Sequence, residues 1–192
     1  MDREQQKNIR RFCIRALQRL IWRKKQLTAF EGVPRSVVLL APERYGDVIL
    51  LTPLIKVLKE AFPSVAVYVV VFKHSSYEFL RHDPSLKGVY HAKHRIGLYV
   101  RKILFRRFDL LFNPKDTPSF TFLWHSLLIA ARFKVAHAHA LHEGFYDYLN
   151  SMDYYSHQIE RNLALLKPLR IERVSSRSEE HTSELQSLGR IS

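Results

Sequence analysis

The sequence lacks several features that define common classes of protein. Its 192 residues include a single cysteine, Cys13, so no disulfide can form within the chain, and a reducing compartment fits this composition. No apolar run approaches the ~20 residues that a membrane-spanning helix needs, because the longest one covers only 65–72. Residues 1–25 are too highly charged to form a secretory signal peptide. The composition therefore favours neither a disulfide scaffold nor an integral membrane protein.

Acidic residues are also scarce. The chain has 18 Asp and Glu against 31 Lys and Arg, a net charge of +13. Residues 1–25 hold nine of these Lys and Arg against Asp2 and Glu4, a net charge of +7. Such a balance is typical of proteins that meet an anionic partner: nucleic acid, an acidic membrane surface or a phosphorylated substrate. With 46% hydrophobic and 12% aromatic residues, the chain can bury a core, and its length fits one domain.

Residues 7–27 have the spacing of a basic amphipathic helix, within a predicted N-terminal segment 1–30. Apolar side chains recur at intervals of three and four residues from Ile9 to Leu27, and arginines flank that face. Such a helix either lies on an anionic membrane or packs on the domain with its basic side in solvent. Nucleic-acid binding is a third interpretation, but no recognised binding motif accompanies the charge.

From residue 31 onward, short strands alternate with amphipathic helices. The first unit is a strand at 36–42, a helix at 47–62 and a second strand at 65–72. Both strands are continuous apolar runs, typical of parallel strands that are buried on both faces. Pro53 either kinks the intervening helix or marks where its regular part begins. A short helix and a turn are expected at 75–86, and further helices at 97–108, 119–133 and 157–169. Further strands are expected at 88–92 and 134–140, and 109–115 is expected to hold a strand followed by a loop.

This alternation predicts an α/β fold with an open, doubly wound, mostly parallel, Rossmann-like sheet over residues 31–174. Ligands of such sheets bind at the carboxyl ends of the strands, and the first loop at that edge is Glu-Arg-Tyr-Gly-Asp, residues 43–47. Gly46 permits either close backbone approach or a positive φ. Asp47 is either the N-cap of the next helix or a functional carboxylate. The loop is not a GxGxxG dinucleotide motif, because it holds one glycine.

Polar residues follow the other predicted strands as well. Arg44 and Tyr45 flank the Gly-Asp pair, and Lys73 and His74 follow the second strand. A later strand is followed by Asn113, Lys115 and Asp116. All of them lie where a cleft is expected, and the cations among them suit phosphorylated sugars. The alternative for each is an exposed loop residue without a binding role.

Three histidines form the one pattern that suggests a metal site. His137 and His139 form a His-x-His pair, which places two imidazoles on one face of a strand, and His142 follows. Glu143 is the acidic residue near them, and the sequence contains no Asp-x-Asp motif. Chance clustering therefore explains the histidines better than a metal site does, and we expect no metal.

The segment SVVLLAPERYGDVILLTPLIKVLKEAFPSVAVYVVV resembles the N-terminal signature of family 9 glycosyltransferases, the ADP-heptose:lipopolysaccharide heptosyltransferases. The matching pairs are Gly46-Asp47, Thr52-Pro53 and Phe62-Pro63. Fainter similarity continues through FLRHDPSLKGVYH, RRFDLLFNPKD and SHQIERNLALLKPL, so the resemblance covers roughly residues 36–170. The family's small hydroxyl residues before Gly-Asp are replaced here by Glu-Arg-Tyr, which leaves the identity of the acceptor open.

The resemblance implies the N-terminal half of a GT-B glycosyltransferase, in which two Rossmann-like domains face a cleft. This half would bind a lipid-linked core oligosaccharide, and a C-terminal domain would bind ADP-heptose. The implied reaction is inverting transfer of heptose to the lipopolysaccharide inner core, with Asp47 as the general base. The implied acceptor-binding residues are Arg44, Tyr45, Gly46, Lys73, His74, Asn113 and Lys115. No metal or cofactor is implied, and the implied location is cytoplasmic, peripheral to the inner membrane.

The C-terminal residues 175–192 do not continue this pattern. Residues 177–187, RSEEHTSELQS, lack apolar periodicity and resemble the translation of a common short-read sequencing adapter. A natural polar tail is the alternative. The adapter interpretation predicts that the natural reading frame continues past residue 176, that the chain is truncated, and that this fragment is inactive alone.

Two other functions remain open at this point. One is a non-catalytic Rossmann-like binding module that is complete as it stands. The other is a basic nucleic-acid-binding protein, which predicts strongly salt-dependent binding to DNA or RNA.

Overall fold

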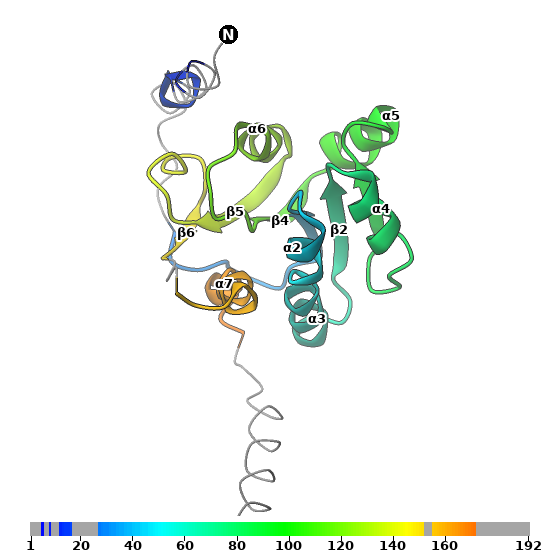
Figure 1. Ribbon diagram of the computed structural model, residues 1–192. Helices are drawn as coiled ribbons and strands as arrows, with labels where there is room; N and C mark the ends of the chain where they lie inside the picture. The colour runs from blue at the N-terminus through cyan, green and yellow to red at the C-terminus, as the bar shows by residue number, and fades with distance from the viewer. Residues whose placement is uncertain (1–4, 6–7, 9–11, 17–26, 152–154, 172–192) are drawn as a thin grey trace, which may run out of the picture.

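The computed structural model describes residues 5, 8, 12–16, 27–151 and 155–171, which form a parallel sheet with helices on both faces (Figure 1). The 6-stranded sheet has the order β3-β2-β1-β4-β5-β6, and each neighbouring pair is parallel. The strands are β1 (Ser36–Leu40), β2 (Ala66–Val71), β3 (Gly88–His91), β4 (Phe108–Asn113), β5 (Ala131–His137) and β6 (Tyr148–Asn150). This order is that of the doubly wound Rossmann-like fold, so the predicted fold class is confirmed.

The connecting helices are short. They are α2 (Tyr45–Ile49), α3 (Thr52–Ala61), α4 (His74–Leu80), α5 (Ile96–Tyr99), α6 (Phe120–Leu128) and α7 (Gln158–Ala164). A π-helical turn, η1 (Val100–Leu104), continues α5, and a 3₁₀ turn, η2 (Lys167–Leu169), follows α7. Residues 12–16 near the N-terminus are also helical.

The sheet has a hydrophobic core on each face, because successive residues of a strand point to opposite sides. Val37 and Leu39 of β1 pack in one core, under α3, α4 and α7. Val38 and Leu40 pack in the other, under α5, η1 and α6. Figure 1 shows α3 and α7 below the sheet and α5 and α6 above it. Burial on both faces explains why the central strands are continuous apolar runs.

Strand β1 is the topological switch point of the sheet. Its neighbours are β2 on one side and β4 on the other, so the chain builds outward from β1 in both directions. The loop after β1 leads to α2 and α3 on one face, while the loop after β4 leads to α6 on the other. The two loops therefore separate at the carboxyl edge, which is where open α/β sheets bind their ligands.

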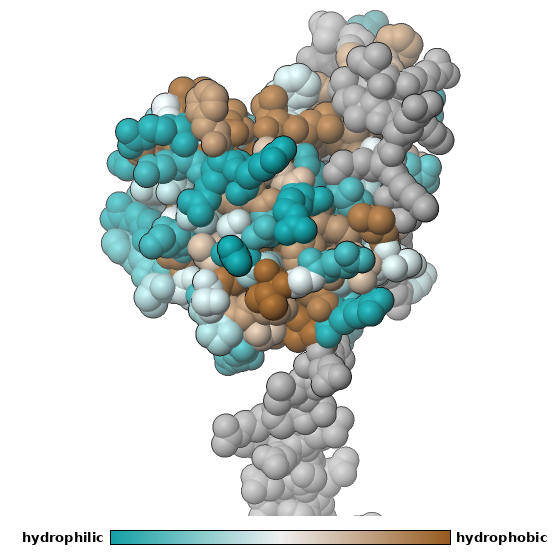
Figure 2. All heavy atoms as spheres, turned by 180° about the vertical axis from the view of Figure 1, so that it is seen from behind, coloured by the Kyte–Doolittle hydropathy of each residue, from teal (hydrophilic) through white to brown (hydrophobic). Residues whose placement is uncertain are grey.

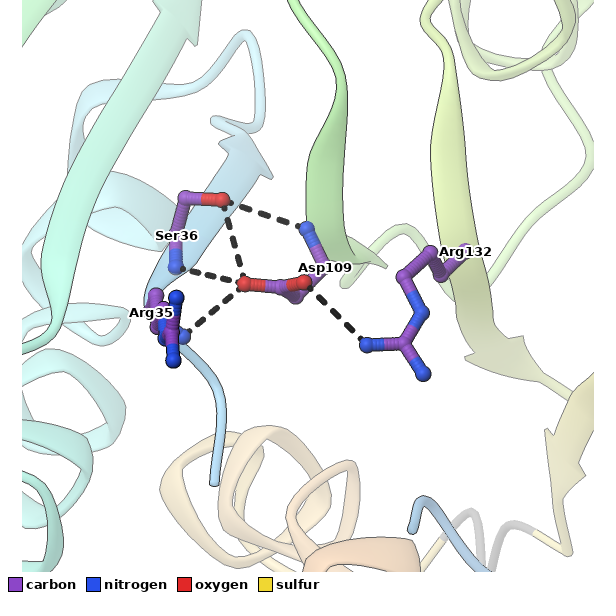
Figure 3. Close-up of polar contacts among 4 residues, drawn as sticks. All are labelled: Arg35, Ser36, Asp109 and Arg132. Atoms are coloured by element: carbon purple, nitrogen blue, oxygen red, sulfur yellow. Dashed lines mark hydrogen bonds and ion pairs between the residues drawn. The ribbon is translucent and has the colours of Figure 1, made fainter. Parts of the chain in front are cut away.

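A carboxylate joins β1 and β4 at the opposite, amino edge (Figure 3). Asp109 accepts hydrogen bonds from the backbone N–H groups of Arg35 at 2.9 Å and Ser36 at 3.1 Å, and from the Ser36 hydroxyl at 3.3 Å. Arg132 of β5 forms an ion pair with it at 3.5 Å. Burial raises the pKa of Asp109, but these donors lower it by more, so it lies below its usual value. Asp109 thus ties the starts of three strands together.

The predicted helix 47–62 is two helices in the structure, and Pro53 marks where the regular one begins. Pro53 lies in the first turn of α3, where its missing N–H costs no intrahelical bond. The carbonyl of Ile49, four residues earlier, accepts instead from the Thr52 hydroxyl at 2.8 Å. Gly46 is helical without a positive φ, so that alternative was wrong.

The predicted helix 119–133 was too long at its C-terminal end. Helix α6 ends at Leu128, Ile129 is extended, and 131–133 already belong to β5, where Ala131 pairs with Phe108. Pairing with β4 therefore overrides the apolar helical pattern. The three-residue edge strand β6 was missed, because a segment of that length shows no periodicity.

The predictions for the two ends fall largely outside the described residues. Of the expected helix 7–27, the structure describes residues 8 and 12–16 as helical and Leu27 as outside any helix or strand. Ile14 is buried in the core under α6. The segment 175–192 lies wholly outside the described residues. Within the described ranges, no helix has the length and apolar character to cross a bilayer.

Candidate active site at the carboxyl edge of the sheet

An ion pair connects the two loops that separate at the switch point. Lys115, after β4, places its Nζ 3.7 Å from Glu43 Oε2, after β1. The same ammonium lies 5.0 Å from the centroid of the Phe122 ring in α6. Lys115 is therefore held at the carboxyl edge by a carboxylate and an aromatic face. It stands at the predicted site, but with its charge partly compensated.

Asp47 is the third residue of α2, and Arg44 is the N-cap. The Arg44 carbonyl accepts the first helical bond from Val48 N at 3.2 Å, and no side chain caps the helix. The N-cap interpretation of Asp47 is therefore wrong. Its side chain is half-buried, and within the described part of the chain no group forms a hydrogen bond or ion pair with its carboxylate. Within the described residues, the lone pairs of this carboxylate are therefore left to solvent or to a ligand.

The surroundings of Asp47 are open on one side and apolar on another. A β-carbon built on Gly46 would meet no atom within 4 Å, so a ligand can approach the backbone there. Tyr45 and Ile49, four residues apart on α2, are both exposed. The Tyr45 ring packs edge-on against Phe79 of α4, with centroids 5.3 Å apart. This contact joins α2, which follows β1, to α4, which follows β2.

The loop after β2 contributes one unpaired cation. Lys73 is exposed, and among the described residues neither it nor Arg44 has an ion-pair partner. His74 begins α4 and lies 3.6 Å from Glu78, which also binds Arg81 at 3.0 Å. Lys73 and Arg44 therefore remain available to an anion, whereas His74 already faces a carboxylate.

Asn113, another predicted acceptor-binding residue, has its side chain in the core. It is fully buried, donates to the Tyr146 hydroxyl at 2.7 Å, and accepts from the backbone N–H of Lys115 at 3.1 Å. Burial raises the pKa of Tyr146 to about 12, although its hydrogen bonds to Ser126 and Asn113 oppose the rise. Asn113 thus shapes the loop that carries Lys115, and this placement does not favour a direct contact with an acceptor.

Two further groups lie at this edge: Asp116, which the sequence places where a cleft is expected, and His137, which it suggested only as part of a metal pattern. Asp116 forms an ion pair with Arg161 of α7 at 3.2 Å, which ties the loop after β4 to the opposite layer. His137, at the end of β5, is fully buried, and neither ring nitrogen has a hydrogen-bond partner among the described residues. Burial lowers the pKa of His137 to about 4; Asp116 raises it slightly, and Arg161 and His142 lower it further. The sequence signal that could have marked His137 as a site residue was its position at the carboxyl end of a strand.

The histidines do not assemble a metal site where the structure can be described. Over 27–151 and 155–171, no three His, Cys, Asp or Glu side chains are placed to hold one ion. His142 is buried beside the His137 carbonyl, with Nδ1 2.9 Å from that oxygen, and His139 lies beyond the end of β5.

A hollow of about 660 Å³ lies elsewhere, along α3. It is lined by Thr52, Pro53, Ile55, Lys56, Lys59, Glu60, Asp83 and Ser85. None of the predicted site residues belongs to it, so the candidate site is defined by the strand ends and not by this hollow.

A parallel sheet of this order with helices on both faces is a Rossmann-like α/β fold, and solved GT-B glycosyltransferases share it. The E. coli heptosyltransferase WaaC, solved with ADP-2-deoxy-2-fluoro heptose, aligns over 74% of this chain with a TM-score of 0.59 and 14% identity. A family 9 glycosyl transferase from Veillonella parvula aligns over 90% with a TM-score of 0.61 and 16% identity. E. coli ADP-heptose lps heptosyltransferase II aligns over 82%, with a TM-score of 0.55 and 16% identity.

The alignments cover 50%, 52% and 51% of those three structures, so this chain spans about half their length. At these identities the likeness establishes the fold. No protein-family model matches the sequence, and neither does any curated protein.

Proposed function

We propose that this chain is the acceptor-binding half of a heptosyltransferase-like glycosyltransferase. The parent enzyme would transfer heptose from ADP-heptose to the lipopolysaccharide inner core by an inverting mechanism. The fold shared with solved heptosyltransferases and the Gly46-Asp47 motif in the first loop support this proposal. The single observation that carries it is the carboxylate of Asp47 at the carboxyl edge of the switch-point strand, with which no described residue forms a bond.

In the proposed reaction, Asp47 accepts the proton of an acceptor hydroxyl as its oxygen attacks the anomeric carbon of the donor. The bond from that carbon to the phosphate oxygen breaks on the opposite face, and ADP leaves with the electron pair. A carboxylate without protein partners suits this role, because it keeps its lone pairs for the substrate. Arg44 and Lys73 would bind phosphate groups of the acceptor, and Tyr45 would pack against a sugar ring.

The donor site lies outside this half in the proposal. The parent chain would continue past residue 176 into a second Rossmann-like domain that binds ADP-heptose, so the fragment alone would be inactive. The acceptor is lipid-linked, so the enzyme would work at the cytoplasmic face of the inner membrane, with the basic segment 1–30 close to the lipid. The net charge of +13 supports a location beside anionic lipid.

The test uses the parent protein, expressed from the gene read beyond codon 176. Transfer of heptose from ADP-heptose to heptose-deficient lipopolysaccharide is measured for the wild type and for Asp47→Asn. Loss of a general base typically lowers the rate ~10²–10⁴-fold, while the thermal unfolding midpoint should stay unchanged. Glu60→Gln is the matched control, because Glu60 is an exposed acid on α3 that pairs with Lys56.

Full activity of Asp47→Asn would overturn the base assignment. Transfer activity of residues 1–176 alone would overturn the division into an acceptor half and a donor half. A parent gene that ends near codon 176 would favour the complete, non-catalytic module instead.

A further inference from the structure

Helix α6 exposes an apolar row on its outer side. Phe120, Trp124 and Leu128 stand four residues apart, which places them along one face of the helix, and all three are exposed. The Phe120 and Trp124 rings stack, with centroids 6.2 Å apart and planes within 11°. The inner face of the same helix fills the core through Phe122 and Leu123. The outer row is therefore additional to what folding requires.

The neighbouring segment adds more exposed apolar side chains. Ile96 is 62% exposed, Leu98 40% and Phe105 84%. Helices α5 and α6 are in contact, since the Tyr99 hydroxyl lies 2.5 Å from His125 Nδ1. Figure 2 shows hydrophobic residues gathered along the upper edge of the molecule, which α5 and α6 form, with hydrophilic residues beside them. We call this region, formed by 93–107 and 120–128, the α5–α6 surface.

The charges of the α5–α6 surface all have one sign. Residues 84–108 contain no Asp or Glu, and 117–131 contain none either. Six exposed cations lie on the 93–107 side of this surface; they are Lys93, Arg95, Arg101, Lys102, Arg106 and Arg107. Helix α6 itself carries no Lys or Arg. The surface thus combines an apolar row on α6 with a cationic segment at 93–107, and apolar and cationic groups together are typical of segments that lie in a membrane interface.

We propose that the α5–α6 surface docks the protein on an anionic lipid bilayer. Trp124 and the phenylalanines would enter the boundary between headgroups and acyl chains, and the lysines and arginines would bind anionic headgroups. This proposal deepens the location suggested above, but it does not depend on the transfer reaction, so the two can fail separately.

The composition of the surface favours lipid over other occupants. A second copy of the chain would bring six like charges against six, which is unfavourable. Nucleic acid matches the cations and can stack on the Phe120 and Trp124 rings, but it has no apolar group to cover the aliphatic Ile96, Leu98 and Leu128, whereas acyl chains do. Interfaces between proteins are depleted of charged residues at their centres, whereas segment 93–107 exposes six cations.

The test measures binding of the full chain to vesicles of phosphatidylethanolamine with phosphatidylglycerol, and to vesicles of phosphatidylcholine alone. We expect binding to the anionic vesicles only. The double variant Phe120→Ser with Trp124→Ser should weaken that binding about tenfold or more. The charge reversals Arg101→Glu with Lys102→Glu should weaken it similarly and reduce its salt dependence.

Matched controls lie elsewhere on the domain. Val33→Ser removes another exposed apolar side chain, and Lys56→Glu with Lys87→Glu makes the same change in net charge. Both controls should bind within about twofold of the wild type, because neither site belongs to the surface. Circular dichroism of each variant checks that folding is intact.

A spectroscopic measurement reports contact directly. The chain has two tryptophans, so Trp22→Phe leaves Trp124 as the sole reporter. Brominated lipids should quench its fluorescence on binding. Vesicle binding that is unaffected by the α6 substitutions, or Trp124 fluorescence that bound lipid does not quench, would overturn the proposal. Equal binding to phosphatidylcholine, or loss of nucleic-acid or protein binding in the variants with vesicle binding unchanged, would do the same.

Discussion

Asp109 and Asp47 lie at opposite edges of the same sheet. The two carboxylates differ in how many protein groups bond to them. Asp109 accepts three hydrogen bonds and an ion pair across the amino edge (Figure 3). Asp47 is half-buried at the carboxyl edge, and no described group bonds to its carboxylate. Folding therefore accounts for the first carboxylate but not for the second. As far as the described residues show, the Asp47 carboxylate therefore remains accessible to a ligand.

The largest expected effect is that of replacing Asp47, the carboxylate without a described partner. In the parent enzyme, Asp47→Asn should lower heptose transfer ~10²–10⁴-fold. The free energy of unfolding should change by no more than about 0.5 kcal/mol, because no structural bond is lost. Rate assays check the expected loss of activity, and urea unfolding of the same preparation checks the expected stability. A loss of stability equal to that of an Asp109 variant would remove the distinction between the two sites.

A second prediction concerns His137, a buried base whose ring nitrogens have no hydrogen-bond partner among the described residues. Its pKa falls from 6.5 to about 4 on folding, so the unfolded chain binds the extra proton between those values. Stability is fully present above pH 6.5 and declines as pH falls toward 4, by about 3 kcal/mol from this group. Urea unfolding at several pH values measures the slope. His137→Leu should flatten it, and an unchanged slope would show that other groups cause it.

A third prediction concerns Asp109 itself. Asp109→Asn should lower the free energy of unfolding at pH 7 by about 1–2 kcal/mol, because a charged acceptor of several partly buried hydrogen bonds becomes neutral. The pKa of Asp109 is lowered in the folded protein. The stability difference should therefore be fully present above its ordinary pKa of 3.8 and shrink as pH falls below it. Parallel unfolding curves over the acid range test this, and a difference that grows in acid would contradict the assignment.

The smallest expected effect is at the Glu43–Lys115 pair between the two loops. Both side chains are partly exposed, so their coupling should be about 0.5 kcal/mol. A double-mutant cycle with Glu43→Gln and Lys115→Met measures this coupling through unfolding. In the parent enzyme, Lys115→Met should raise KM for a phosphorylated acceptor more than it lowers kcat. An effect on kcat alone would mean that Lys115 does not bind the acceptor.

Much of the fold could be predicted from local patterns. The unit from β1 to β2 was recognised because parallel strands buried on both faces are continuous apolar runs. The C-terminal end of α6 and the strand β6 were not, since both depend on pairing with other strands. Ala131 joins β5 because it pairs with Phe108 of β4, 23 residues away, and not because of its neighbours in the chain.

The candidate site was predictable in position but not in contacts. The motif located Gly46 and Asp47 at a strand end, and the structure leaves both open. The sequence equally suggested Asn113 and Lys115, yet one is buried against Tyr146 and the other pairs with Glu43. Those partners lie far away in the chain, so no local spacing could reveal them.

The sequence by itself determined the strand–helix order, the excess of positive charge and the placement of a Gly-Asp pair after the first strand. These properties depend on residues close together in the chain, whose apolar period and turn chemistry can be read directly. Only the tertiary structure decided which of the two carboxylates, Asp109 or Asp47, is hydrogen-bonded by other protein groups. Asp109 meets Arg35 and Ser36 across 74 and 73 positions of sequence, whereas Asp47 meets no described partner. Such satisfaction depends on distant segments that become neighbours only when the sheet assembles.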